Sequence, residues 1–446
     1  MPPEVLAFSK TIWQFIHPFL KPIWEIFKDW WWVPLPFILW KRFLFMWLWW
    51  KNEKWLYSKE YRPVMLEIKI PREILKPIRA MEAVMSSLHA VIYHPPDWWE
   101  KWIDGQLQLS MALEIVSIGG APHFFIRFNY PYRKAVEAAL YSQYPNIEIQ
   151  EVDDYSKYVP QDIPNKEWDL WAADYRLLKP DPYPIKTYAQ FETESEALEE
   201  KRIDPIADLL EAMAKMTPDE QLWIQIRAEP LSQPDENAQY AHFLKEGEEI
   251  RDKIARRKKP PEPVSMLKEM VNVISGNPSA PPAEEKEMIP SEMKMTPGER
   301  EIITAVEQKM SKPAFSVGVR FIYLGKRDVF YNPNFRLAFT YFNEFVTANL
   351  NNIQPFHVTK IKKSWFLPYN LLRPRRDYLR CRRLFRNYRE RFSPFYPRFK
   401  ITKGTFILNT EELASLYHFP SAIVSPVPTI PRIESKRGGP PPELPV

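Results

Sequence analysis

Two stretches of this chain repeat the same order of apolar patterns, and the repeat limits the folds that the chain can adopt. In residues 63–155, a strand-like run is followed by a helical stripe, two strands around Gly119 and Gly120, a second helical stripe and a closing strand. This order, βαββαβ, is that of a ferredoxin-like unit. We therefore predict an α+β fold whose first folded unit spans residues 63–155.

The same order returns, more stretched, in residues 156–361. Strands are expected there at 168–178, 185–191, 221–228 and 314–324, and helices at 206–213 and 337–349. The last strand of this unit is either 356–361 or 405–408, and the pattern does not choose between them. The prediction is two tandem ferredoxin-like units.

A long insertion, about 231–311, interrupts the second unit between its hairpin strands. It opens with a charged helix over 239–257 and closes with a helix capped at Thr296. The segment between them, 260–290, is rich in proline, serine and glutamate, and it is predicted to be disordered because it cannot bury much apolar surface.

The first 62 residues hold ten of the seventeen tryptophans and form a separate, membrane-associated segment in this interpretation. The run 30–50 is long enough to span a bilayer. However, Lys41 and Arg42 lie at its middle, where each charge costs roughly 2.5–3.5 kcal/mol, and tryptophan favours the headgroup boundary. The pattern favours an interfacial or re-entrant anchor over a clean span, with a buried apolar hairpin as the third alternative. The side chains expected at the membrane are Trp30, Trp31, Trp32, Trp40, Trp47, Trp49 and Trp50.

The charges around this segment suggest an orientation. Lys51, Lys54, Lys59 and Arg62 follow the tryptophan-rich run directly, and no small-residue cleavage site of a signal peptide is visible. By the positive-inside tendency, the body of the protein is expected at the cytoplasmic face of the cell membrane.

Residues 362–403 form a basic segment rich in arginine and aromatic residues. Between Lys360 and Lys403 there are fifteen lysines and arginines against two acids, whereas the whole chain has a net charge of only +5. Such a concentration of charge favours a polyanion or an acidic surface as partner. The candidate binding residues are Arg373, Arg375, Arg376, Arg380, Arg382, Arg383, Arg386, Arg389 and Arg391.

Three interpretations of this arginine-rich segment remain open. Guanidinium groups pair with phosphates and aromatic rings stack on unpaired bases, so residues 373–400 are suited to single-stranded DNA. Anionic lipid or an acidic partner would also fit. Alternatively, the segment is a helix, about 375–391, with arginines in water and an inner side made of Leu379, Leu384, Phe385 and Tyr388.

The last 43 residues, 404–446, combine a short strand, a short helix and a stiff arm. Thr410 is the expected N-cap of the helix, with Glu411 and Glu412 in its first turn. Beyond Pro420 seven further prolines keep the backbone extended. Partner docking is expected on this arm at Arg432, Lys436 and Arg437.

Enzyme motifs are not visible. The one Gly-Lys pair, Gly325-Lys326, lacks the other positions of a phosphate-binding loop. The seven histidines are scattered, and His89 and His94 are five positions apart, which does not suit a helical metal pair. The single cysteine, Cys381, has arginine neighbours that could lower its pKa, but no paired base, so an unreactive thiol is favoured. No catalytic residue, cofactor or metal is expected.

The stretch NTEELASLYHFP (409–420) followed by RIESKRGGPPPELP (432–445) resembles the segment just before the motor domain in type IV secretion-like, conjugative DNA-transfer ATPases of bacteria. Supporting matches are LEIKIP (66–71), LEIVSIGGAPHFFIRF (113–128) and RFIYLGKRDVF (320–330). The resemblance implies a membrane-proximal platform that carries or docks the motor. The catalytic residues of that family cannot be transferred, because their positions do not occur in this sequence.

Taken with the resemblance, the residues predict a membrane-anchored, non-catalytic platform subunit of a DNA-transfer apparatus. Its expected partners are the membrane and a separate P-loop ATPase motor, and self-association into a homo-oligomer is left open. The alternative is a nucleic-acid-binding module that holds single-stranded DNA on residues 373–400.

Overall fold

The computed structural model describes residues 24–25, 28–30, 32–71, 76–193, 204–231, 237–256, 295–361, 370, 372–394 and 404–420. The chain divides into two compact units. The smaller unit takes the described residues up to 59 together with 96–107, and the larger unit takes the remainder.

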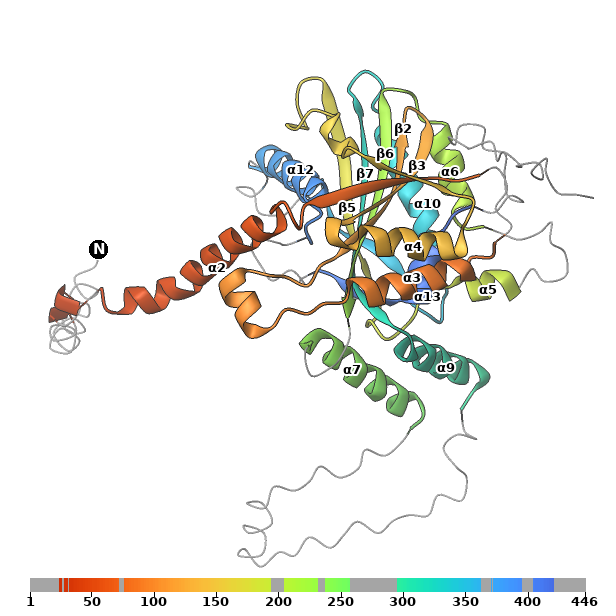
Figure 1. The fold of residues 1–446 in the computed structure, drawn as a ribbon, viewed down its shortest axis with the longest axis horizontal. Coiled ribbons are helices and arrows are strands. Elements are labelled where there is room, and N and C mark those ends of the chain that lie inside the picture. The colour runs from red at the N-terminus through yellow and green to blue at the C-terminus, as the bar shows by residue number, and fades with distance from the viewer. Residues whose placement is uncertain are drawn as a thin grey trace, which may run out of the picture. The chain divides into compact units, whose positions relative to one another are not determined.

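The larger unit is built on one antiparallel sheet of nine strands, counted over the described residues (Figure 1). Neighbouring strands follow the order β4-β1-β3-β2-β6-β7-β5-β8, and β9 pairs with one end of β7. The strands are β1 (Pro63–Lys69), β2 (Met111–Ile118), β3 (Ala121–Asn129), β4 (Glu148–Val152), β5 (Trp168–Leu177), β6 (Glu220–Leu231), β7 (Ala314–Lys326), β8 (Ile353–Val358) and β9 (Phe406–Asn409). The prediction of an α+β fold is confirmed.

The first half of the sheet follows the predicted order of elements. Helix α3 (Arg79–Ile92) lies between β1 and β2 in the chain, and α4 (Arg133–Gln143) lies between β3 and β4. The β2–β3 hairpin turns at Gly119 and Gly120, whose φ angles of 59° and 82° suit glycine. A Cβ at Gly120 would lie 2.8 Å from the Met216 carbonyl oxygen, so the turn also needs glycine for this close approach.

The second half repeats the order with α6 (Ala207–Ala214) between β5 and β6, and α10 (Leu337–Asn343) between β7 and β8. The halves meet where β2 pairs with β6, from Met111 opposite Ala228 to Ile118 opposite Gln221. Because of this pairing, both halves share one continuous sheet.

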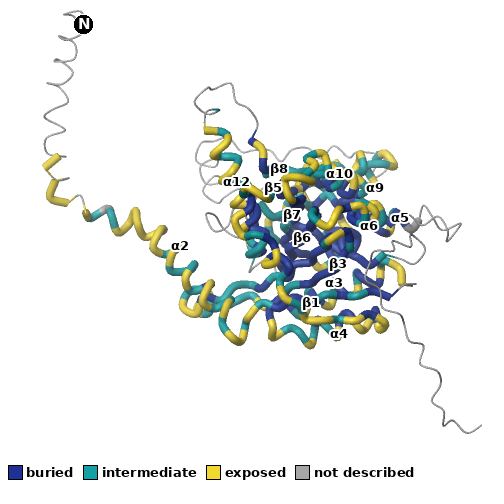
Figure 2. The backbone as a smooth tube through the Cα atoms, turned by 90° about the horizontal axis from the view of Figure 1, so that it is seen from above, coloured by how far each residue is buried: buried dark blue, intermediate teal, exposed yellow. Residues whose placement is uncertain are grey.

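Helices cover the two faces of the sheet unequally (Figures 1 and 2). The face that carries Phe124 contacts Tyr417 and Phe419, which follow helix α13 (Thr410–Leu416), and α3 packs against α13. The face that carries Phe125 shares its core with Leu384 of helix α12 (Arg373–Arg389). Neighbouring residues of β3 therefore belong to two different cores.

Three details differ from the sequence prediction. Residues 185–191, expected as a strand, run into helix α5 (Tyr188–Thr193), because their backbone is bound by α13: Ile185 N–H donates to Glu412 Oε1 (2.8 Å) and Tyr188 N–H to Ser415 Oγ (2.9 Å). Both candidates for the last strand form strands, β8 beside β5 and β9 beside β7. Asn409, and not Thr410, caps α13 through a capping box with Glu412.

The insertion contributes helices α7 (Ala238–Ile254) and α9 (Pro297–Ser311), and the predicted cap at Thr296 is confirmed by its capping box with Glu299. Phe243 of α7 packs with Leu231, Ala314 and Ile407, so the insertion covers the end of the sheet where β9 joins β7. The segment 260–290 lies outside the described residues.

The smaller unit consists of α2 (Pro34–Leu56) and a loop, 96–107, that contains the short π-helical turn η1 (Glu100–Asp104). Across the described residues, no helix combines the length and apolar character needed to cross a membrane.

Candidate functional site

The inner side of α12 is apolar and attaches the helix to the sheet. Leu384, Phe385 and Tyr388 are buried, and the Tyr388 ring centroid lies 5.2 Å from that of Trp223 on β6. These three residues pack inward as the helix interpretation predicts. Leu379 does not: it is 54% exposed, and its predicted place on the inner side is wrong.

Under the C-terminal end of α12, a row of polar side chains crosses the sheet from strand to strand. The register pairs Glu114 with Gln225, Gln225 with Arg320, Arg320 with Asp174, and Asp174 with His357. Because paired residues of adjacent antiparallel strands point to the same face, these side chains lie on the α12 side. The helix is bound to this row by Gln225 Nε2, which donates to the Tyr388 carbonyl oxygen (3.1 Å).

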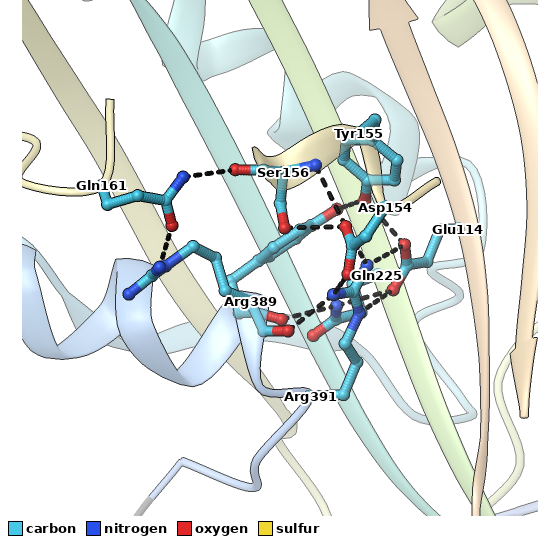
Figure 3. Close-up of polar contacts among 9 residues, drawn as sticks. Glu114, Asp154, Tyr155, Ser156, Gln161, Gln225, Arg389 and Arg391 are labelled. Carbon is cyan, nitrogen blue, oxygen red and sulfur yellow. Dashed lines mark hydrogen bonds and ion pairs between the residues drawn. The ribbon is translucent and has the colours of Figure 1, made fainter. Parts of the chain in front are cut away.

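Arg391, just after α12, is the centre of the polar contacts at this end of the helix (Figure 3). Its Nε and Nη2 donate to Glu114 Oε1 (2.8 Å) and Oε2 (3.0 Å), and its guanidinium also pairs with Asp154. Tyr155 OH donates to Glu114 Oε2 (2.7 Å) and contacts Tyr388 OH (2.6 Å). Loop, sheet and helix are thus joined by one buried guanidinium group.

Burial and pairing shift the pKa values in this network. Burial alone would raise the pKa of the Asp154 carboxyl, but the Arg391 guanidinium outweighs it, and the pKa lies below its usual value. Burial also raises the pKa of the Tyr155 phenol well above its ordinary value, and the carboxylate of Glu114 adds to that shift. The network therefore pairs an ionised Asp154 with a charged Arg391 beside neutral phenols, which is the pattern of a structural ion pair.

The nine arginines predicted to bind a polyanion separate into three groups. Arg375, Arg382, Arg383 and Arg386 are exposed on the outer side of α12. Arg391 belongs to the buried network, with its side chain 5% exposed, and is not part of this outer surface. The half-buried group is Arg373, Arg376, Arg380 and Arg389.

The half-buried arginines are engaged by the protein itself. Arg373 lies 3.6 Å from Asp377, Arg380 donates to the Val358 carbonyl oxygen (3.2 Å), and Arg389 donates to Gln161. Residues 395–403, the end of the predicted basic segment, lie outside the described residues.

The smaller unit exposes a second candidate surface, made of aromatic side chains. On α2 the large apolar side chains are exposed on every side of the helix, from Phe37 (78%) through Trp40 (56%) to Trp50 (52%). Four consecutive positions, 37–40, are exposed, and consecutive positions of a helix point in different directions. Lys51 lies over the rings of Trp47 and Trp50, at 5.2 and 5.8 Å from their centroids.

The loop 96–107 joins α2 in this unit. Trp47 Nε1 donates to the Trp102 carbonyl oxygen (3.2 Å). Gly105, with φ 77°, lies so close to the helix that a Cβ there would be 2.5 Å from Lys51 Cβ. The loop exposes two more indole rings, Trp98 (68%) and Trp99 (62%).

The predicted membrane tryptophans are placed as follows. Trp30, Trp32, Trp40 and Trp50 are exposed and Trp47 and Trp49 half-buried, while Trp31 lies outside the described residues. The prediction missed Trp98, Trp99 and Trp102. Three tryptophans within five residues are a visible signal, but they lie between a predicted helix and a predicted strand, and no local pattern links them to residues 30–50.

The C-terminal docking residues Arg432, Lys436 and Arg437 lie outside the described residues. The segment before them, 405–419, is deeply buried. Its Glu412 carboxylate forms an ion pair with Lys309 of α9 (Nζ to Oε2, 3.1 Å), and both side chains are fully buried. Its last aromatic residue, Phe419, lies 5.0 Å from the ring of Tyr144 in the first half. This segment is therefore fastened to both halves of the sheet.

The metal-binding and nucleophilic groups of the described residues are placed as follows. Among these residues, no group of three or more His, Cys, Asp or Glu side chains could hold a metal ion. A cleft of about 900 Å³ borders α12 and is lined by three carboxylates. Asp169 and Asp377 are paired with Arg327 (3.2 Å) and Arg373, and Asp162 accepts a hydrogen bond from Asn165 Nδ2 (3.0 Å). Cys381 lines the same cleft; burial raises its pKa to about 12, so the neighbouring arginines do not activate it.

A family described as a domain of unknown function (DUF8128) matches residues 64–427. The match covers the described sheet except its first residue, Pro63, together with α12 and the segment 405–419, and begins after the N-terminal aromatic run. A search of curated proteins gave no match.

Proposed function

This chain belongs to the DUF8128 family, and we propose that it is a non-catalytic platform that attaches to the membrane interface and docks a separate motor protein. The observation that supports membrane attachment is the exposure of large apolar side chains on the smaller unit. An exposed helix with aromatic and aliphatic side chains on all sides is unfavourable in water. The same side chains suit the boundary between lipid headgroups and acyl chains, where indole rings accumulate.

The attachment is interfacial in this proposal. Trp98 and Trp99 of the loop add indole rings to those of Trp40 and Trp50 on α2. Lys51 and Lys54 lie over indole rings at the end of the helix, an arrangement in which the ammonium groups stay at the headgroups while the rings enter the boundary. The positive residues that follow α2 support the cytoplasmic face of the cell membrane as the location.

The motor part of the proposal rests on the sequence resemblance and on the C-terminal segment. The resemblance suggests a P-loop ATPase of a type IV secretion-like DNA-transfer apparatus as the partner. The segment 405–419 supports it, because a force applied to the arm after Pro420 would act on both halves of the sheet through Glu412 and Phe419. Arg432, Lys436 and Arg437 are the proposed docking residues. The alternative, single-stranded DNA held on residues 373–400, would place the ligand on α12.

The finer fold proposal is that each half of the sheet is a ferredoxin-like unit. It is supported by the order of elements, βαββαβ in both halves, and by the strand orders β4-β1-β3-β2 and β6-β7-β5-β8. In both orders the first and third strands of the unit lie in the middle.

Flotation of the full-length protein with phosphatidylcholine vesicles tests the membrane part. We expect the wild type to float with the vesicles and the double variant Trp98→Ser, Trp99→Ser to lose most of that binding, because it lacks two of the exposed indole rings. The variant should still fold, because exposed rings can be removed without loss of packing. Tyr331→Ser is the matched control, since Tyr331 is 62% exposed in the larger unit. Wild-type protein that stays in the soluble fraction would refute interfacial attachment.

The motor part needs its own experiment. The intact protein should retain a P-loop ATPase when purified gently from its native cells, and a variant with Arg432, Lys436 and Arg437 replaced by Gln should release it. Repeated purification of the intact protein without any associated P-loop ATPase would contradict the docking proposal.

A further inference from the structure

We propose that the outer side of α12 is a contact surface for anionic phospholipid membranes. The inference deepens the proposed membrane attachment, on which it rests, by adding a second surface and a lipid class. It concerns a different part of the molecule from the tryptophans, because α12 belongs to the larger unit.

The outer side of α12 combines positive charge with exposed apolar groups. Arg375, Leu379, Arg382 and Arg386 follow one another at helical spacing, and all four are exposed. Leu379 is 54% exposed, and Leu372, one turn before Arg375, is 60% exposed. The one acid within α12, Asp377, accepts a hydrogen bond from the Ile361 N–H (2.8 Å) and does not belong to this outer row.

The aromatic group on this side is already oriented among the arginines. Tyr378 is 41% exposed, and its hydroxyl oxygen accepts a hydrogen bond from Arg382 Nη1 (2.7 Å). The Arg382 guanidinium also lies 5.6 Å from the centroid of the Tyr378 ring. A tyrosine whose ring and hydroxyl are both engaged by arginine is less available to stack on a base than a free ring would be.

The mixture of residues favours a membrane over a nucleic acid. Phosphate groups of either ligand would pair with the arginines, so the charge alone does not decide. Exposed leucines gain nothing from a sugar-phosphate backbone, whereas at a bilayer surface their side chains enter the acyl boundary while guanidinium groups stay with the lipid phosphates. Leu372 and Leu379 on the arginine side therefore indicate lipid.

The helix is held firmly enough to present this surface as a unit. Its inner residues are fixed by the core around Trp223, and its C-terminal end is fixed by the contacts of Arg391 with Glu114 and Asp154. Binding at the outer side therefore does not have to supply the energy of folding the helix, which is the main cost for a disordered basic segment.

The test compares full-length protein on phosphatidylcholine vesicles and on vesicles that also contain phosphatidylglycerol, at low salt. The variant Arg382→Gln, Arg383→Gln, Arg386→Gln should keep the wild-type affinity for phosphatidylcholine and lose roughly 100-fold in its affinity for the anionic vesicles, since each surface arginine contributes on the order of fivefold. Leu379→Ser should weaken binding to the anionic vesicles by several-fold without a change of charge.

The control Lys134→Gln, Lys245→Gln, Lys253→Gln removes the same charge from exposed positions on α4 and α7. It should retain most of the anionic preference, and an equal loss in both triple variants would overturn the proposal. An unchanged preference of the α12 variant for anionic vesicles would also overturn the proposal. A variant that loses only its binding to a single-stranded oligonucleotide would overturn it too, and would assign the surface to nucleic acid. Replacing Trp98 and Trp99 tests the attachment of the smaller unit through its binding to phosphatidylcholine vesicles, so that result is independent of the result for the α12 surface.

Discussion

At the scale of single residues, Arg391 shows why a residue type and its place in the chain do not define its role. It follows α12 with φ 55°, a left-handed conformation in which glycine is the usual residue. An arginine there costs about 1–2 kcal/mol in backbone strain. The structure offsets this cost because the position directs the guanidinium to Glu114 and Asp154.

Replacing Arg391 by glycine separates the two effects. The change relaxes the backbone but leaves the buried Glu114 carboxylate without a cation, which costs about 3–5 kcal/mol. We expect a net loss of about 1–4 kcal/mol in the free energy of unfolding, measured by urea denaturation. The second substitution Glu114→Gln should recover part of the loss. Arg386→Ala, at an exposed position, should change stability by less than about 0.5 kcal/mol. An Arg391→Gly protein as stable as the wild type would show that the buried pair contributes nothing.

Asp181 gives a prediction for pH. Its carboxylate accepts a hydrogen bond from the Ile407 N–H (3.2 Å), and burial raises its pKa from 3.8 to about 6, although Lys309 opposes the shift. Because the pKa is higher in the folded protein than in the unfolded chain, the stability that Asp181 contributes is fully present below about pH 4 and is lost as the pH rises through about 6.

The variant Asp181→Asn, whose amide oxygen can still accept from Ile407, removes this titration. It should be more stable than the wild type at about pH 7.5, by about 1–3 kcal/mol, and the difference should disappear at about pH 4. Urea denaturation of both proteins across this pH range measures it. A difference that does not depend on pH, or that grows as the pH falls, would contradict the assignment.

At the scale of elements, the segment 405–419 is a structural part of the sheet unit. Ile407, Leu413, Leu416 and Tyr417 are almost completely buried, and β9 pairs with β7 from Ala314 opposite Asn409 onwards. Each fully buried side chain of this kind contributes about 1.5–3 kcal/mol. The four side chains together contribute about 6–12 kcal/mol of burial free energy, part of which is offset by the entropy cost of ordering the segment.

Two truncations test this view. A chain that ends at Pro420 should melt within a few degrees of the full-length protein, followed by circular dichroism. A chain that ends at Gly404 should fail to fold, because it exposes Phe124 and Tyr144 and leaves the buried Lys309 without Glu412. If the shorter chain folded with a similar melting temperature, the segment would be only an accessory of the sheet.

Apart from residues 185–191, the order of strands and helices could be predicted from the sequence, because apolar alternation and helical spacing are local properties. The features that the prediction missed depend on distant residues. Residues 185–191 do not form the expected strand, because the Ile185 N–H donates its hydrogen bond to Glu412, 227 positions later in the chain. Arg391 becomes buried because Glu114 lies 277 positions away in the chain and beside it in the fold. No local pattern contains these contacts.

The candidate surfaces, too, could be predicted only where they depend on local sequence patterns. The exposed arginines at 375, 382, 383 and 386 could be expected from the helix pattern, and so could the inward packing of Leu384, Phe385 and Tyr388. The contribution of the loop 96–107 could not be expected, because this loop lies between α3 and β2 in the sequence but belongs to the same unit as α2. Its glycine at 105 allows the close contact with Lys51, which only the folded unit reveals.

At the scale of the whole molecule, the two units differ in how they treat apolar side chains. The larger unit buries them in two cores on either side of one sheet, whereas the smaller unit leaves Phe37, Trp40, Trp98 and Trp99 exposed. A soluble surface rarely carries so many large apolar groups close together without a binding role. We therefore propose that the smaller unit attaches to a membrane interface.

The most direct measurement places a reporter on the loop itself. The chain has a single cysteine, Cys381, so a Cys381→Ser protein with Trp98→Cys can carry one environment-sensitive fluorophore at position 98, and Tyr331→Cys in the same background is the reference. On phosphatidylcholine vesicles, the fluorophore at 98 should shift to shorter wavelength and brighten, while that at 331 stays unchanged. An unshifted spectrum at position 98 on protein that floats with the vesicles would contradict the claim that this unit enters the interface.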